Sequence, residues 1–132
     1  MRKDLLLVCL AVLFSTTSHA EEIKETPQFR TCMDAVDLGA FKNTQWAACY
    51  AEELVRQDTA LNDTYRRLAN SLDADAKASL VTGERSWLAY REHWCRFEAK
   101  TNMAPGGEVN RNACLLELTL KQINRLDSFI MP

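Results

Sequence analysis

Cysteine is the residue type in this chain whose chemistry is easiest to specify. Four of the five cysteines lie beyond residue 20, namely Cys32, Cys49, Cys95 and Cys114. A zinc site favours short paired spacings of the C-x-x-C type, whereas the intervals between these cysteines are 17, 46 and 19 residues. An even number of cysteines in a small exported chain is typical of a disulfide framework. We therefore expect two disulfides and neither a metal nor another cofactor.

A second set of residues combines polar and aromatic side chains, and all but the first of them form two groups spaced three or four positions apart, where they share a helix face. In chain order they are Glu53, Asp58, Asn62, Tyr65, Glu84, Trp87, Arg91 and Trp94. If the chain turns near residue 72, Arg91 lies opposite Glu53. The set could be a surface that grips a partner, since Trp, Tyr and Arg are favoured anchors. The alternative is a polar network between helices around a Trp core. We favour the network, because aromatics in an apolar stripe usually pack and partly buried charges usually pair.

No catalytic constellation accompanies these residues. His93 is the only histidine beyond residue 20, and the nearby Cys95 is expected to be oxidised, so a nucleophile–histidine pair is not available. The acidic pairs at 52–53 and 73–75 each lie on one helix, whereas a glycosidase needs two carboxylates about 5–10 Å apart across a cleft. The sequence contains no phosphate loop, dinucleotide fingerprint or zinc-protease motif. We therefore expect a protein that is not an enzyme.

The elements that position these residues read as helices, because apolar residues recur at steps of three, four and seven. The patterns predict a short helix over 29–38 and three longer ones, from 43 or 44 to 70, from about 73 to 101, and over 109–129. No segment alternates with period two over a useful length. The expected fold is all-α, with one short N-terminal helix and three longer helices in a mostly antiparallel bundle.

Hairpin geometry also bears on the disulfides. With turns near residues 42, 72 and 104, all four cysteines gather at one end of the bundle. The position of the cysteines along the bundle axis does not by itself fix which of them pair. The sequential pairs Cys32–Cys49 and Cys95–Cys114 close the shortest loops and are preferred, and each should contribute about 3 kcal/mol.

The first twenty residues read as a signal peptide. Arg2 and Lys3 precede an unbroken apolar run over 5–14, and the small residues Ser18 and Ala20 suit cleavage after Ala20. Ten apolar residues are too few for a mature membrane anchor, which needs about 20. We expect a periplasmic or secreted protein without a membrane anchor after cleavage.

Composition fits one soluble domain in the 132 residues, with 47% hydrophobic and 26% charged residues. The expected layout is a signal peptide (1–20), a flexible polar tail (21–28) and a single helical domain (29–132). The 16 basic and 18 acidic residues give a formal net charge of −2. This mild acidity argues against a nucleic-acid partner, which would normally require a basic face.

Two stretches and a closing segment resemble the LprI-like lysozyme-inhibitor family of exported bacterial proteins. The first stretch comprises Cys49, Asp58, Leu61, Asn62 and Tyr65. The second comprises Leu80, Glu84, Arg85, Trp87, Leu88, Tyr90, Arg91 and Cys95. The closing segment comprises Cys114, Leu115, Leu118, Thr119 and Leu126. The likeness covers about 31–126. The departures are Gly83 for Ala, Glu84 for Gln, Glu92 for Asp and Gln122 for Arg.

The resemblance implies an exported helical binding module that inhibits lysozyme-type muramidases, with the 102–107 loop or Arg91 as candidates for entry into the enzyme cleft. An acidic inhibitor would be steered toward commonly basic lysozymes. Two alternatives stay open. One is a structural or assembly factor that binds another envelope protein. The other is a small-ligand carrier, which a pocket lined by Trp87 and Trp94 would favour, whereas an exposed Trp or Tyr patch would favour protein binding.

Overall fold

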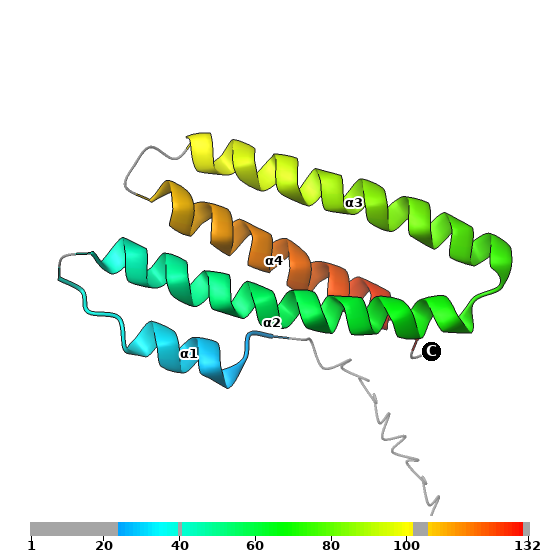
Figure 1. Cartoon of the computed structure of the whole chain (residues 1–132), viewed down its shortest axis with the longest axis horizontal. Coiled ribbons are helices and arrows are strands. Elements are labelled where there is room, and N and C mark those ends of the chain that lie inside the picture. The colour runs from blue at the N-terminus through cyan, green and yellow to red at the C-terminus, as the bar shows by residue number, and fades with distance from the viewer. Residues whose placement is uncertain (1–23, 40, 102–105, 131–132) are drawn as a thin grey trace, which may run out of the picture.

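The computed structural model describes residues 24–39, 41–101 and 106–130, so the expected signal peptide lies outside the described residues. Four helices follow one another, namely α1 (Pro27–Asp34), α2 (Lys42–Ser71), α3 (Ala74–Thr101) and α4 (Gly107–Asp127). Consecutive helices run antiparallel, and α4 runs parallel to α2 (Figure 1). Helix α4 packs most extensively, against α2 and α3, and α1 packs on α2. The expected all-α bundle of one short and three longer helices is confirmed.

The first helix begins earlier and ends earlier than the apolar pattern predicts. Thr26 is its N-cap, and the Thr26 hydroxyl accepts a hydrogen bond from the Phe29 amide at 3.2 Å. Pro27 follows at the first helical position, where a missing N–H costs nothing. Residues 27 and 28, expected in the tail, therefore belong to α1. The helix ends at Asp34, four residues before the predicted boundary.

The start of α2 differs from the prediction in its capping. Asn43 and Thr44, where the sequence pattern placed the start of this helix, lie inside it, and the N-cap position is held by Phe41 without a side-chain hydrogen bond. Phe41 has φ 69°. A left-handed backbone costs a residue with a side chain roughly 1–2 kcal/mol, because Cβ approaches the following carbonyl. This start is therefore held by its surroundings rather than by local preference.

Helix α3 begins as predicted. The Asp73 carboxylate accepts from the Ala76 amide at 2.8 Å and caps the first turn. Gly83 lies within α3, and a Cβ added there would meet nothing within 4 Å. No close approach of another element therefore requires a glycine at this position. Helix α4 begins at Gly107, two residues before the predicted start.

Apolar residues from α2, α3 and α4 form a core at the end of the bundle that carries the α2–α3 turn. Its buried members are Leu61, Leu68, Ile123 and Leu126, with Tyr65, Leu80 and Trp87 packed against them. Two smaller clusters lie toward the other end, one around Cys95, Cys114 and Leu115 and one around Phe29, Cys49 and Leu116. No described helix combines the length and the apolar character needed to span a membrane.

Both preferred disulfides are confirmed. Cys32 pairs with Cys49 at a Cα–Cα distance of 5.7 Å, and Cys95 pairs with Cys114 at 5.5 Å. The first bridge ties α1 to α2, and the second ties α3 to α4. All four cysteines thus lie near the end of the bundle that carries the α1–α2 and α3–α4 connections (Figure 1).

Candidate functional site

A groove of about 240 Å³ runs between α2 and α3 and contains three of the predicted site residues. It is lined by Leu61, Asn62, Tyr65, Val81, Glu84, Arg85 and Leu88. Asn62 is exposed, Tyr65 and Glu84 are half-buried, and Leu88 is 43% exposed. The groove offers polar and apolar contacts side by side, which is a composition suited to a protein side chain.

Arg91 lies one turn further along α3 and cross-links three helices. Its Nη1 donates to Asp58 Oδ1 on α2 at 2.6 Å and to Thr119 Oγ1 on α4 at 2.7 Å. The guanidinium also lies 5.1 Å from the centre of the Trp87 ring, a favourable cation–π distance. Because only 7% of Arg91 is exposed, this side chain is placed to hold the helices together, as expected of a polar network.

Glu84 forms a second polar link from α3 to α4, through a hydrogen bond from the Gln122 amide. Burial disfavours the charged carboxylate and raises the pKa of Glu84, although the bond from Gln122 acts in the opposite direction. Gln122 is itself buried. Glu84 thus places a partly buried carboxyl group, whose pKa lies above its ordinary value, at the edge of the groove.

Glu53 does not meet Arg91 and lies away from the groove. Its carboxylate is fully buried and accepts hydrogen bonds from Thr26 N at 2.8 Å, Thr26 Oγ1 at 2.6 Å and Gln57 Nε2 at 2.8 Å. Arg56 Nε adds an ion pair at 2.8 Å. Burial alone would raise the pKa of Glu53, but these hydrogen bonds outweigh it and the pKa is lowered. Glu53 therefore anchors the segment before α1.

Trp94 belongs to an exposed aromatic row on α3, which we call the α3 ladder and which comprises Tyr90, Trp94 and Phe97. Their exposed fractions are 49%, 42% and 54%. The Tyr90 and Trp94 rings stack with centroids 6.0 Å apart, and the Trp94 and Phe97 rings are tilted at 5.5 Å. His93 is exposed on the same helix. Large aromatics that remain in water on a folded domain are candidates for partner contact.

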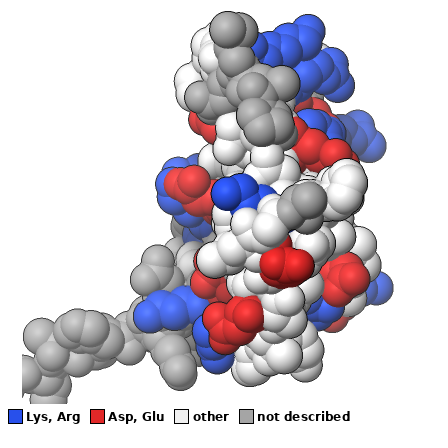
Figure 2. Space-filling view, turned by 90° about the vertical axis from the view of Figure 1, so that its left-hand side faces the viewer, with Lys and Arg blue, Asp and Glu red and all other residues white. Residues whose placement is uncertain are grey.

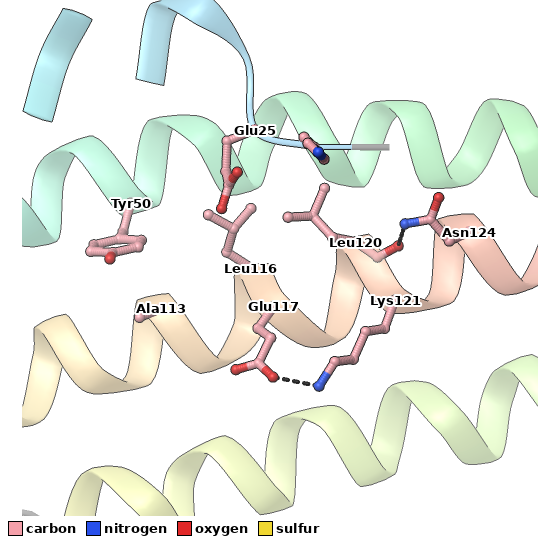
Figure 3. Close-up of a pocket in the computed structure, with 9 residues that line it drawn as sticks. Glu25, Tyr50, Ala113, Leu116, Glu117, Leu120, Lys121 and Asn124 are labelled. Carbon is pink, nitrogen blue, oxygen red and sulfur yellow. Dashed lines mark hydrogen bonds and ion pairs between the residues drawn. The ribbon is translucent and has the colours of Figure 1, made fainter. Parts of the chain in front are cut away.

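A larger hollow of about 450 Å³ lies between α2, α4 and the segment before α1 (Figure 3). Leu116 and Leu120 form its apolar floor, and the ion pair of Glu117 with Lys121 borders it. Tyr50 reaches it from α2. None of the eight predicted residues lines this hollow, so sequence patterns did not indicate it.

Two buried residues of the polar network were not predicted to be part of it. Thr119 is fully buried and receives Arg91, and Gln122 is buried and donates to Glu84. Both lie on the apolar stripe of α4 that carries Leu115 and Leu126. Polar residues inside such a stripe are a usable signal, because buried polar groups require partners. No group of acidic, histidine and cysteine side chains suited to a metal ion occurs among the described residues.

The family model of the lysozyme inhibitor LprI matches residues 39–126. No curated protein and no solved structure matches the chain. The matched range contains α2, α3 and α4 almost entirely, together with the groove, the polar network and the α3 ladder. The chain therefore belongs to the LprI lysozyme-inhibitor family, and the resemblance in its cysteine and Trp-Arg motifs is confirmed. Helix α1 with Cys32 lies outside the matched range.

Proposed function

We propose that this chain is an exported binding module that inhibits lysozyme-type muramidases by direct protein contact. The observation that carries the proposal is the family match over 39–126, because that range includes α2, α3 and almost all of α4. The family is one of inhibitors rather than enzymes. On this proposal, the chain acts by binding a partner protein and catalyses no reaction itself.

The positions of the aromatic residues support protein binding over ligand transport. Trp87 packs against the apolar core, whereas Trp94 lies in the exposed α3 ladder. Neither residue lines the groove between α2 and α3. A carrier would need a pocket enclosed by such rings. The groove, at about 240 Å³, is smaller than the roughly 300 Å³ of most ligand pockets, and the larger hollow of about 450 Å³ is lined by neither Trp residue. The exposed ladder is instead a surface on which a protein can dock.

Charge supports a basic partner. Removal of the first twenty residues takes away Arg2, Lys3 and Asp4, so the 16 basic and 18 acidic residues become 14 and 17. Complementary charge speeds association and loses its effect as salt is added. Export of the chain rests on the N-terminal pattern of the sequence and places it with the cell-wall enzymes that it would meet.

The test is a titration of the oxidised mature protein, residues 21–132, into a lysozyme cell-wall lysis assay at low and high salt. A sample that has been reduced and alkylated serves as the matched control. We expect saturable inhibition that weakens with salt and falls strongly in the control. A helical, oxidised sample that leaves a panel of muramidases fully active would refute the proposal. Fractionation of expressing cells tests export separately, since retention of an uncut chain in the cytoplasm would contradict it.

A further inference from the structure

The connection between α1 and α2, residues 35–41 with residue 40 outside the described part, presents two large apolar side chains to water. Phe41 is 81% exposed and Leu38 is 71% exposed. Phe41 is the most exposed of the large hydrophobic residues described. We call these two side chains the apolar tip. Neither packs into a core cluster, so the tip contributes little to folding.

The backbone at the tip is strained as well as exposed. Phe41 is the only described residue other than glycine with a positive φ, at 69°. Asn or Gly would adopt this conformation at lower cost, and either would avoid placing a ring in water. A bulky residue that gains no packing from a strained position needs an explanation outside the folded chain, and strained positions cluster at binding sites.

Three contacts hold the tip in one arrangement. The Gln45 side chain accepts from the Asp37 amide at 3.0 Å, and the Gln45 amide donates to the Phe41 carbonyl at 3.2 Å. One residue thus fixes both sides of the loop. The Asp37 carboxylate also accepts from the Gly39 amide at 2.9 Å. A loop held in this way loses little conformational entropy when it binds.

A disulfide closes the base of the same loop. Cys32 and Cys49 flank it, and their bridge fixes α1 against α2 on either side of the tip. Figure 2 looks onto this end of the molecule, where acidic and basic residues are interspersed with uncharged ones. The tip therefore lies at the end of the bundle, between two helices that the bridge holds together.

The acidic residues beside the tip indicate the charge of its partner. Asp34 and Asp37 precede the tip, and neither forms an ion pair within the described part of the chain. The basic residue that follows, Lys42, lies 5.8 Å from the centre of the Trp46 ring. An exposed apolar tip with acidic residues beside it fits a concave site in a basic protein.

We infer that Phe41 enters the substrate cleft of the inhibited muramidase, with Leu38 packing at the cleft edge. This inference rests on the proposed function and assigns the inserting element within it. Retaining glycosidases of the lysozyme type keep their acid carboxyl in an apolar pocket, and an aromatic ring can fill such a space and exclude the attacking water. Inhibition is then competitive with soluble chitin oligomers.

The experiment compares oxidised full-length mature proteins in the lysis assay. Phe41→Gly and Phe41→Asn both remove the ring from a backbone that each new residue tolerates. We expect their inhibition constants to rise at least about tenfold, as for truncation of an interface anchor, while their melting temperatures stay level or rise. The inhibition constant of Leu38→Ala should rise severalfold. Phe129→Ala is the matched control, because Phe129 is 72% exposed after α4, near the opposite end, and it should inhibit as the unchanged protein does.

The outcomes separate the two proposals. Full inhibition by both Phe41 variants, or binding of the chain to the muramidase that soluble chitin oligomers do not displace, overturns the role of the tip and leaves the inhibitor function standing. If Trp94→Ala loses inhibition and Phe41→Gly keeps it, the role of the tip is overturned as well, and the contact is assigned to the α3 ladder. No inhibition by the unchanged protein overturns both proposals.

Discussion

Replacement of Arg91 by Ala tests whether the polar network is structural. The Arg91 bond to Thr119 joins a buried charge to a fully buried hydroxyl, which is worth about 1.5–3 kcal/mol. The pair with Asp58 adds at most about 0.5–1 kcal/mol, because the Asp58 side chain is 40% exposed. Stacking on Trp87 adds about 0.5–1 kcal/mol. We therefore expect Arg91→Ala to cost about 2.5–5 kcal/mol, which overlaps the range of about 3–5 kcal/mol for breaking a buried charge pair.

Urea unfolding followed by far-UV circular dichroism measures this cost, and a double-mutant cycle apportions it. Asp58→Asn alone should lower the free energy of unfolding by about 1 kcal/mol or less, since Arg91 keeps its hydrogen bond to Thr119. The double variant should cost little more than Arg91→Ala, because the Asp58 contribution depends on Arg91. Inhibition, measured at a temperature where the variant is folded, should be unchanged.

Two results would contradict this reasoning. A cost below about 1 kcal/mol for Arg91→Ala would mean that the buried guanidinium is not what couples the helices. A variant of unchanged stability with lost inhibition would place Arg91 in contact with the partner, as the alternative interpretation of the sequence allowed. Either result would move the structural role to the apolar core.

Three further predictions concern single side chains. Glu53→Gln should lower the free energy of unfolding by about 2 kcal/mol at pH 7. Because the pKa of Glu53 is lowered in the folded protein, its stabilisation is complete above the unfolded pKa of about 4.3 and is lost as the pH falls through the folded pKa. The urea midpoints of the variant and the unchanged protein should therefore converge in acid. Glu84→Gln should stabilise at pH 7, since the raised pKa of Glu84 reflects a buried charge, and the gain should disappear once the pH falls below that pKa; a loss of stability at pH 7 would contradict it. Gly83→Ala should raise the free energy of unfolding by about 1 kcal/mol, because the Cβ has open space, and an unchanged thermal midpoint would argue against it.

The helices and disulfides were accessible from sequence because their signals are periodic and local. Apolar steps of three and four identify a helix face wherever it packs, and cysteines at matched heights limit the possible bridges. The start of α2 was not accessible in this way. Asn43 and Thr44 are better caps than Phe41 by local preference, yet the Phe41 carbonyl accepts the first hydrogen bonds of the helix, from the Thr44 and Gln45 amides.

The partner of Arg91 shows why hairpin arithmetic alone was insufficient. Equal distance from the turn predicted Glu53, whereas the structure pairs Arg91 with Asp58. Side chains in a helix lean toward its N-terminus. In an antiparallel pair, Arg91 on α3 therefore leans toward the α2–α3 turn, and residues of α2 lean away from it. The contact moves by about one helical turn, which brings Asp58 into reach and leaves Glu53 to the segment before α1.

The two ends of the bundle are stabilised by different means, and this has a consequence for activity. At the end with the α2–α3 turn, the buried core residues Leu61, Leu68, Ile123 and Leu126 are held by packing, with no cysteine among them. At the other end, both smaller clusters contain disulfide cysteines. Reduction removes the covalent ties around the apolar tip while the aliphatic core persists. Inhibition should therefore be lost at reductant concentrations that leave much of the helical signal intact, because the rigidity of the tip depends on the Cys32–Cys49 bridge and most of α2 does not.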